Sequence, residues 1–387
     1  MSSYSTLNPS QRILMGPGPS DVHPRVYSAL SAPVVGHLDP EFLQVMEDNK
    51  SLLQMVFQTQ NRLTLPISGT GSAGMETCLV NIVEPGDQVL VCINGVFGMR
   101  MKDVAERCGA VVTTVEAAWG EAIAAEKVEA ALEETAFKLV GIVHAETSTG
   151  VLQPLGDIAK LVKESGALLL VDAVTSLGGV ELAVDEWGID LCYSGTQKCL
   201  SCPPGLSPIT FSQSALDIMQ NRTSKVQSWY LDLSMIAKYW GEERVYHHTA
   251  PISMNYALRE ALVLIAEEGL EQRWQRHLKN HQALVRGIEA MGLEMAVAAE
   301  YRLPSLNSVK VPEGIDEAEV RQYLLREFSL EIGAGLGDLK GKVWRVGLMG
   351  HASNIKNVTL FLTALENALH RQGMQVERGA VYQALLG

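Results

Sequence analysis

The sequence predicts an α/β protein with a mostly parallel central sheet flanked by helices, followed by a smaller C-terminal α+β unit. Short apolar runs alternate with amphipathic stretches between about residues 65 and 211, which is the pattern of repeated βαβ units. A long helical stretch ends this repetition, and shorter elements follow it. The chain has 387 residues, which is enough for two or three structural units.

Six apolar runs in the first part are predicted strands. They cover residues 88–93, 110–115, 139–144, 167–172, 190–194 and 206–211. The clearest helix between them has apolar residues at helical spacing, with Gly166 as its end: Leu155, Ile158, Ala159 and Val162. The strand that follows is apolar almost throughout, so we expect helices on both faces of the sheet.

The second part begins after a long helix predicted over residues 253–291. Segments 304–311 and 343–349 are predicted strands, and amphipathic helices are expected near residues 316–328 and 358–369. These elements differ in character from the repeated units before them. We therefore place a boundary near residue 270, between a large unit of residues 21–270 and a small unit of residues 271–387.

The charge balance excludes some classes of partner. The chain has 31 Lys and Arg against 44 Asp and Glu, a net charge of −13. Nucleic acids and anionic membrane surfaces are bound mainly through Lys and Arg, so neither is an expected partner. No apolar run has the 18 to 20 or so residues that a membrane crossing needs, and the six cysteines lack a framework spacing. We expect a cytoplasmic protein with reduced thiols.

A glycine-rich turn, Gly69-Thr-Gly-Ser-Ala-Gly74, follows an apolar segment and opens a predicted helix over residues 75–83. Its spacing matches the dinucleotide-binding pattern, but the strand at 88–93 ends in Asn94, where that fold needs an acidic residue for the ribose. The free N–H groups of a helix N-terminus also suit a single phosphate group. A phosphate site and a tight turn without a ligand both stay open.

Asp172 closes one predicted strand, and Lys198 follows another after a short polar turn, Ser194-Gly-Thr-Gln-Lys198. In an open α/β sheet such positions face the crevice at the carboxyl ends of the strands, where ligands bind. A lysine in a crevice loses ammonium stability and can form a Schiff base, and an aspartate there can hold the protonated ring nitrogen of pyridoxal phosphate. A phosphate turn, an aspartate and a lysine in this order suit that cofactor, although a plain ion pair is the alternative.

Seven motifs extend from near the N-terminus to the last quarter of the chain. They are Met15-Gly-Pro-Gly-Pro-Ser20, Ser68-Gly-Thr-Gly-Ser-Ala73, Glu146-Thr-Ser-Thr-Gly-Val-Leu-Gln-Pro154, Val171-Asp-Ala-Val-Thr-Ser-Leu-Gly-Gly179, Tyr193-Ser-Gly-Thr-Gln-Lys198, Tyr246-His-His-Thr-Ala-Pro251 and Trp344-Arg-Val-Gly-Leu-Met-Gly350. Together they resemble the alanine–glyoxylate and serine–pyruvate aminotransferases, in the class V branch of fold-type I pyridoxal-phosphate enzymes. The resemblance implies transfer of an amino group from alanine or serine to glyoxylate by a homodimer. It also implies an N-terminal arm, residues 1–20, at the site and the dimer contact.

The resemblance implies roles for individual residues. Lys198 would bond to the cofactor and move the α-proton, while Asp172 would bind the ring nitrogen. Around the ring and the substrate, the implied residues are Val174 and Phe97 on the two ring faces, Thr147 near the ring hydroxyl, and Gly18 and Arg345 at the substrate. The implied phosphate ligands are Thr70, Gly71, Ser72 and Gln197, with Tyr246 and Thr249 reaching across from a second subunit. Phe97 and Thr147 stand where the animal enzymes have tryptophan and serine, and no metal is expected.

Arg345 also has an interpretation of its own. It interrupts an apolar strand on which Val343, Arg345 and Gly347 share one face. A guanidinium that points into a protein needs a planar anion as its partner, because an unpaired buried charge is costly. A structural carboxylate and a substrate carboxylate both satisfy this need, and the resemblance favours the substrate.

Cys199-Leu-Ser-Cys202 directly follows the lysine. A zinc or thiol redox site is not favoured, because the chain has no second C-x-x-C and His247-His248 does not have ligand spacing. The related cysteine desulfurases need a reactive cysteine late in the chain, and residues 203–387 contain none. His144 is left without an assigned role.

Three alternative functions remain. An enzyme for phosphoserine or an aminophosphonate would need extra cationic groups for the second anion of its substrate. A dehydrogenase would bind nicotinamide at the glycine turn and would be colourless. A non-catalytic partner subunit would bind the cofactor without turnover.

Overall fold

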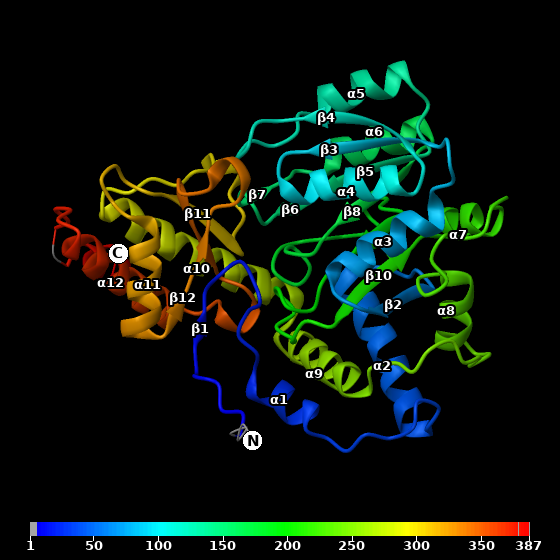
Figure 1. Cartoon of the computed structure of the whole chain (residues 1–387), viewed down its shortest axis with the longest axis horizontal. Coiled ribbons are helices and arrows are strands. Elements are labelled where there is room, and N and C mark those ends of the chain that lie inside the picture. Colours follow the sequence, from blue (N-terminus) through cyan, green and yellow to red (C-terminus); the bar gives the residue numbers. More distant parts are fainter. Residues whose placement is uncertain (1–5, 378, 387) are drawn as a thin grey trace, which may run out of the picture.

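The computed structural model describes residues 6–377 and 379–386, so the first five residues of the predicted arm lie outside the described residues. A seven-stranded sheet forms the centre of the larger part, in the order β2-β10-β9-β8-β5-β3-β4 (Figure 1). β10 runs antiparallel to both of its neighbours, and the other adjacent pairs are parallel. The strands are β2 (Leu63–Ser68), β3 (Gln88–Ile93), β4 (Val111–Glu116), β5 (Leu139–Val143), β8 (Leu168–Asp172), β9 (Leu191–Tyr193) and β10 (Leu206–Phe211). The predicted α/β class with a mostly parallel sheet is confirmed.

Both faces of this sheet are buried. Alternate side chains of β8 enter two different cores, with Leu168 and Leu170 on one face and Leu169 and Val171 on the other. The first face is covered by α3 (Gly71–Ile82), α4 (Val96–Arg107), α7 (Gln213–Gln220) and α8 (Leu233–Trp240). The second face is covered by α5 (Ala125–Glu134), α6 (Gly156–Ser165) and α9 (Ile252–Glu268), while α2 (Pro40–Phe57) contributes to both cores.

The six strands predicted in the larger part match observed strands to within one residue at each end, although β2 was not among them. Two predicted helices differ from the observed ones. The long helix predicted over residues 253–291 is wrong: α9 ends at Glu268 and α10 (Leu270–Ala290) begins after Gly269. Gly269 has φ +85°, a conformation that interrupts a helix and that glycine adopts without strain. The helix predicted from residue 75 begins earlier, at Gly71, so the second glycine of the turn already belongs to α3.

The smaller part has a core of its own. It is built from β11 (Leu306–Lys310), β12 (Leu330–Glu331), β13 (Gly333–Ala334), β14 (Val343–Gly347), α10, α11 (Glu317–Phe328), α12 (Ile355–Arg371) and α13 (Ala380–Leu386). Its sheet has the order β11-β14-β13. The division at residue 270 stays a prediction.

The N-terminal segment is attached to this smaller part. β1 (Ile13–Leu14) pairs in parallel with β12, and the carbonyl of Met15 accepts a hydrogen bond of 2.7 Å from the Gly347 amide. Figure 1 shows the blue start of the chain beside β12 before it continues to α1 (Pro24–Leu30). Among the described residues, no helix is both long and apolar enough to span a membrane.

Candidate active site

Asp172 and Tyr193 end two adjacent parallel strands, β8 and β9, whose register places them opposite each other. The Tyr193 hydroxyl donates to Asp172 Oδ2 at 2.6 Å, and the Val174 amide donates to Oδ1 at 2.8 Å. Burial raises the pKa of Asp172 to about 6, against the lowering effect of these hydrogen bonds. The carboxyl is therefore mostly ionised above neutral pH, and its remaining lone pairs can accept a further donor.

Lys198 lies in the loop after β9 and is almost fully buried. Its ammonium donates to the carbonyl of Pro17. Burial, reinforced by the charge of Arg345, lowers the pKa of Lys198 to about 8. A sizeable fraction of this amine is neutral near pH 8, and the neutral form is the one that attacks carbonyl groups and accepts protons.

The N-terminal segment covers Lys198. The Ser20 amide donates to the Gln197 carbonyl at 2.9 Å, and the Ser20 hydroxyl donates to the Lys198 carbonyl at 2.7 Å. Gly18 lies between these contacts with φ +108°, and a Cβ added there would be 2.7 Å from Lys198 Nζ. The backbone at position 18 can therefore approach Lys198 this closely only because glycine has no side chain.

We expect Gly18→Ala to remove the reactive lysine from its position while the protein still folds. The new methyl group needs the space of the Lys198 side chain, and alanine is strained at this φ. Borohydride reduction after addition of pyridoxal phosphate, read by mass spectrometry, should label Lys198 at least about ten-fold more slowly than in the wild type. Gly314→Ala is the control, because it also has positive φ but no neighbour within 4 Å. Equal labelling rates in Gly18→Ala and the wild type would contradict the prediction.

The glycine turn brings the predicted phosphate residues to the N-terminus of α3. Thr70 is the N-cap residue, but its side chain makes no capping hydrogen bond, and Ser72 is exposed. Gly71 packs closely, since a Cβ there would be 3.3 Å from Val174 Cγ2. Gln197 lies near this turn: a Cβ added to Gly195 would be 2.8 Å from Gln197 Oε1 and 3.5 Å from Gly71 Cα. The Oε1 atom of Gln197 is buried and has no hydrogen-bond partner among the described residues. The N–H groups at the start of α3 and the Nε2 donor of Gln197 suit a small anion, whereas Oε1 needs a donor.

A buried carboxyl holds the start of α4. Glu146 ends β6 (Ala145–Glu146), which forms a hairpin with β7 (Val151–Leu152). Glu146 Oε2 accepts from the Phe97 amide at 3.2 Å, and Oε1 accepts from the Ser148 amide and hydroxyl. A Cβ on Gly95 would be 2.4 Å from the Glu146 carboxyl carbon, so this approach requires glycine. Burial raises the pKa of Glu146 to about 7.

The same hairpin contacts Arg345 on β14. Arg345 donates to the carbonyl of Thr147 at 3.0 Å and to the carbonyl of Ala334 at 2.7 Å. The Thr147 hydroxyl is hydrogen-bonded to that of Thr175. Burial lowers the pKa of Arg345 to about 10, although the charge of Glu146 opposes this. The ion pairs among the described residues include none of Arg345, so the structural carboxylate considered above is not its partner.

Among the described residues, neither Tyr246 nor Thr249 forms a hydrogen bond with Lys198 or with the glycine turn. Both are exposed after α8, where the Tyr246 hydroxyl lies 3.4 Å from that of Thr249. Tyr246 also contacts the ring of His37. Their predicted role depends on a second subunit.

Sequence analysis assigned no role to Tyr193, Glu146 or Arg100. The position of Tyr193 near the end of a predicted strand, one strand after that of Asp172, could have indicated that the two side chains meet. Glu146 is an acid at the end of an otherwise apolar stretch, which marks a buried carboxyl. Arg100, discussed below, gives no signal of its own because exposed arginines are common on helices.

His144, Cys199 and Cys202, which the sequence also singled out, are buried side chains. His144 packs edge-on against Trp187, and burial lowers its pKa to about 4. Cys199 and Cys202 are buried thiols whose pKa values are raised. Among residues 6–377 and 379–386, no group of three or more His, Cys, Asp or Glu side chains could hold a metal ion.

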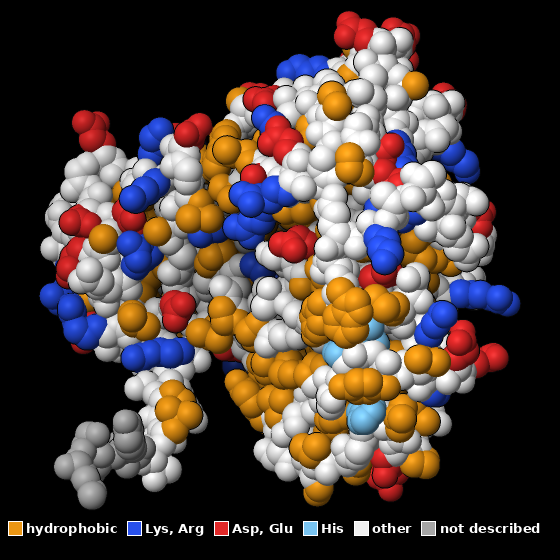
Figure 2. Space-filling view, turned by 45° about the vertical axis from the view of Figure 1, so that its right-hand side comes forward, with side chains coloured by type: hydrophobic (Ala, Val, Ile, Leu, Met, Phe, Trp, Pro, Cys, Tyr) orange, Lys and Arg blue, Asp and Glu red, His pale blue; other side chains and the backbone are white. Residues whose placement is uncertain are grey.

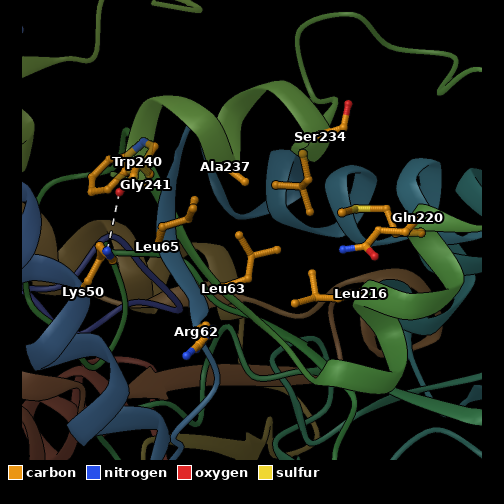
Figure 3. A pocket seen from close by; sticks show the side chains of 12 residues that line it. Lys50, Arg62, Leu63, Leu65, Leu216, Gln220, Ser234, Ala237, Trp240 and Gly241 are labelled. Atoms are coloured by element: carbon orange, nitrogen blue, oxygen red, sulfur yellow. Dashed lines mark hydrogen bonds between the residues drawn. The ribbon is translucent and has the colours of Figure 1, made fainter. Parts of the chain in front are cut away.

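A separate cavity lies between α7, α8 and β2 (Figure 3). It has a volume of about 370 Å³ and is lined mainly by apolar side chains such as Leu63, Leu65 and Leu216. None of the predicted site residues lines it. It is therefore separate from the residues around Lys198.

Comparison with known proteins identifies the family. The sequence profile described as "Aminotransferase class-V" matches residues 23–339, which include Lys198 and Asp172. The chain belongs to the class V aminotransferases. The fold-type I architecture expected from the resemblance agrees with this membership.

Three relatives of this aminotransferase cover nearly its whole length. The crystal structure of an alanine–glyoxylate aminotransferase from Nostoc sp. is 51% identical, has a TM-score of 0.94, and covers 95% of this chain and 97% of its own. The alanine–glyoxylate aminotransferase of Mus musculus is 44% identical over 92% of this chain and 87% of its own length. The (S)-ureidoglycine–glyoxylate transaminase of Bacillus subtilis is 41% identical over 100% of this chain and 97% of its own.

Proposed function

We propose that this aminotransferase moves an amino group from alanine to glyoxylate, giving pyruvate and glycine, with pyridoxal phosphate as its cofactor. The observation that carries the proposal is the burial of a lysine, a carboxyl and an arginine without a carboxylate partner in one crevice: Lys198, Asp172 and Arg345. The names of the Nostoc and mouse relatives support alanine as donor.

The described residues fit the proposed cofactor. The turn from Thr70 to Ser72 offers free N–H groups to a phosphate, and the side-chain amide of Gln197 can donate to it through Nε2. Asp172 has free lone pairs for a ring N–H, and Val174 and Phe97 are available for the ring faces. When bound, pyridoxal phosphate supplies an aldehyde that joins amino groups and a ring that withdraws the electrons of a cleaved C–H bond.

The chain's own groups then bind the substrate and move protons. Arg345 binds the α-carboxylate of the amino acid through the donors that its two carbonyl partners leave free. Lys198 Nζ takes the proton from the donor's Cα, and its lowered pKa keeps it available as a base. Asp172 holds the ring N–H in a buried setting where its charge is poorly screened. Pro17 and Gly18 limit the entry of water at Lys198.

A second donor has specific support. The Bacillus relative aligns with the whole chain and is named for (S)-ureidoglycine, and its name shares glyoxylate with the other two relatives. The relatives' names therefore support glyoxylate as the acceptor more strongly than they support any one amino donor. Serine, with pyruvate as a further acceptor, is the other donor that the resemblance implies.

A donor and acceptor panel tests the proposal. The purified protein should be yellow, alanine should convert its absorbance in a single turnover, and glyoxylate should restore it. The panel contains alanine, serine, (S)-ureidoglycine, phosphoserine and 2-aminoethylphosphonate, each with glyoxylate and pyruvate. Failure of glyoxylate with every neutral donor would exclude the proposal, and bound cofactor without any turnover would indicate a non-catalytic subunit.

Arg345→Ala should weaken the binding of amino acids and keto acids by roughly 2 to 5 kcal/mol. The variant removes the protein's half of the buried charge pair that Arg345 would form with the substrate carboxylate. KM for alanine and for glyoxylate should rise together, while the affinity for pyridoxal phosphate stays within about three-fold of the wild type. Steady-state kinetics and cofactor titration measure these quantities. Arg326→Ala, at an exposed arginine on α11 of the smaller part, is the control. Unchanged kinetics in Arg345→Ala would place the carboxylate site elsewhere.

We also propose a homodimer with shared active sites. Hydrophobic and histidine side chains gather on one face of the molecule (Figure 2). The exposed large hydrophobic residues of the described chain include Trp229, Tyr230, Val245 and Tyr246. Trp229 stacks on His247 at 4.4 Å, next to the predicted phosphate residues Tyr246 and Thr249. Sedimentation equilibrium tests the assembly, and a monomer at working concentration would contradict it. The cytoplasm stays our proposed compartment, in line with six free cysteines.

A further inference from the structure

The residues predicted to hold the cofactor phosphate carry no charge. They are Thr70, Gly71, Ser72, Gln197, Tyr246 and Thr249. A phosphate monoester carries roughly −1.5 to −2 charges at neutral pH, whereas a helix N-terminus offers only about half a positive charge. With a net charge of −13, the rest of the protein repels such a group. The site therefore needs a cation beside the turn.

Arg100 lies at this place. It is on α4, one turn after Phe97, and its Nη1 is 3.4 Å from the hydroxyl of Ser72 on α3. Its guanidinium carbon is 5.0 Å from the centre of the Phe97 ring. The same side chain thus touches a residue predicted for the phosphate and one predicted for the cofactor ring.

Arg100 is also without an acidic partner. Within residues 6–377 and 379–386, its one side-chain hydrogen bond goes to Ser72, and it takes part in no ion pair. Arg107, on the same helix, instead binds Asp103 at 2.9 Å. The charge of Arg100 still reaches the crevice, since it lowers the pKa of the buried Asp172.

We propose that Arg100 binds the phosphate of the cofactor as its main side-chain counter-charge and, through the Phe97 ring, fixes the residue that stacks on the cofactor. This inference rests on the proposed function. A guanidinium next to Ser72 can donate to phosphate oxygens from outside the turn, whereas Thr70, Gly71 and Ser72 donate from within it.

The experiment compares two probes that differ only in the phosphate. Cofactor-free enzyme is titrated with pyridoxal phosphate and with pyridoxal, and the affinity is read from the absorbance of the imine. Arg100→Gln should raise Kd for pyridoxal phosphate about ten-fold and leave Kd for pyridoxal within about two-fold. Arg100→Lys, which keeps the charge, should recover much of this loss. Arg107→Gln is the matched control on α4 and should change neither affinity.

Salt and phosphorus NMR provide independent readouts. The affinity of the wild type for pyridoxal phosphate should fall with ionic strength more steeply than that of Arg100→Gln. The ³¹P resonance of the bound cofactor should titrate at a higher pH in Arg100→Gln, because the dianion loses its counter-charge.

The outcomes separate this inference from the proposed function. If the wild type forms no imine with pyridoxal phosphate, the proposed function fails. If the wild type forms it but Arg100→Gln weakens both probes equally, Arg100 acts through Phe97 alone and the counter-charge is overturned. Equal affinities of the wild type and Arg100→Gln for pyridoxal phosphate would also overturn it.

Discussion

Lys198→Ala should abolish amino transfer, with kcat at least about 10⁴-fold below that of the wild type. The variant removes the buried amine that lies between Pro17 and the charges of Arg345 and Asp172. Both functions proposed for Lys198, covalent attachment of the cofactor and movement of the α-proton, depend on its Nζ atom. Single-turnover absorbance with alanine measures the effect directly.

The structure supplies the controls for this variant. Lys160→Ala removes an exposed lysine on α6 and should leave the rate unchanged. Borohydride should fix pyridoxal phosphate at residue 198 of the wild type and of Lys160→Ala, and nowhere in Lys198→Ala. A small amine such as methylamine, which fits the space left by the side chain, should restore part of the rate. Turnover near that of the wild type in Lys198→Ala would refute the assignment.

Asp172→Asn should reduce kcat by about 10² to 10⁴-fold while cofactor still binds. The amide keeps an oxygen for the Val174 amide but loses the negative charge proposed to keep the ring nitrogen protonated. The visible spectrum of bound pyridoxal phosphate and the rate of α-proton exchange in deuterated water measure the loss. Asp338→Asn, on the exposed surface, is the control.

The same substitution should stabilise the cofactor-free protein. Because burial raises the pKa of Asp172 from 3.8 to about 6, its ionisation opposes folding above pH 6, by an amount on the order of 3 kcal/mol. This cost disappears below pH 4, where the carboxyl is neutral in both the folded and the unfolded protein. The urea midpoint of Asp172→Asn should therefore exceed that of the wild type at pH 8, and the difference should shrink towards pH 4. A lower midpoint at pH 8 would contradict this expectation.

The sequence allowed the sheet and the centre of the site to be predicted, because both depend on local patterns. Apolar runs located six strands of the central sheet to within about one residue. Asp172 is the last residue of one of these runs, and Lys198 follows another after a short polar turn. The break at Gly269 was missed because apolar spacing continues on both sides of it, so that only the backbone conformation marks the interruption.

The contacts that could not be predicted depend on three-dimensional packing. Glu146 meets the Phe97 amide only because the β6–β7 hairpin lies against the start of α4, where Gly95 leaves room. Arg100 meets Ser72 through the packing of α4 on α3. The predicted phosphate-binding role of Tyr246 and Thr249 depends on a second subunit, and the position of a second subunit does not follow from the pattern of one sequence.

The pairing of β1 with β12 has a consequence for protein synthesis. Ile13 and Leu14 leave the ribosome 317 residues before their partners Leu330 and Glu331. Until then, the segment that carries Pro17 is held at Lys198 by the hydrogen bonds of Ser20 to Gln197 and Lys198, without the support of β12. The central sheet, whose strands all precede β12, can thus form before the cover over Lys198 gains its β1–β12 pairing.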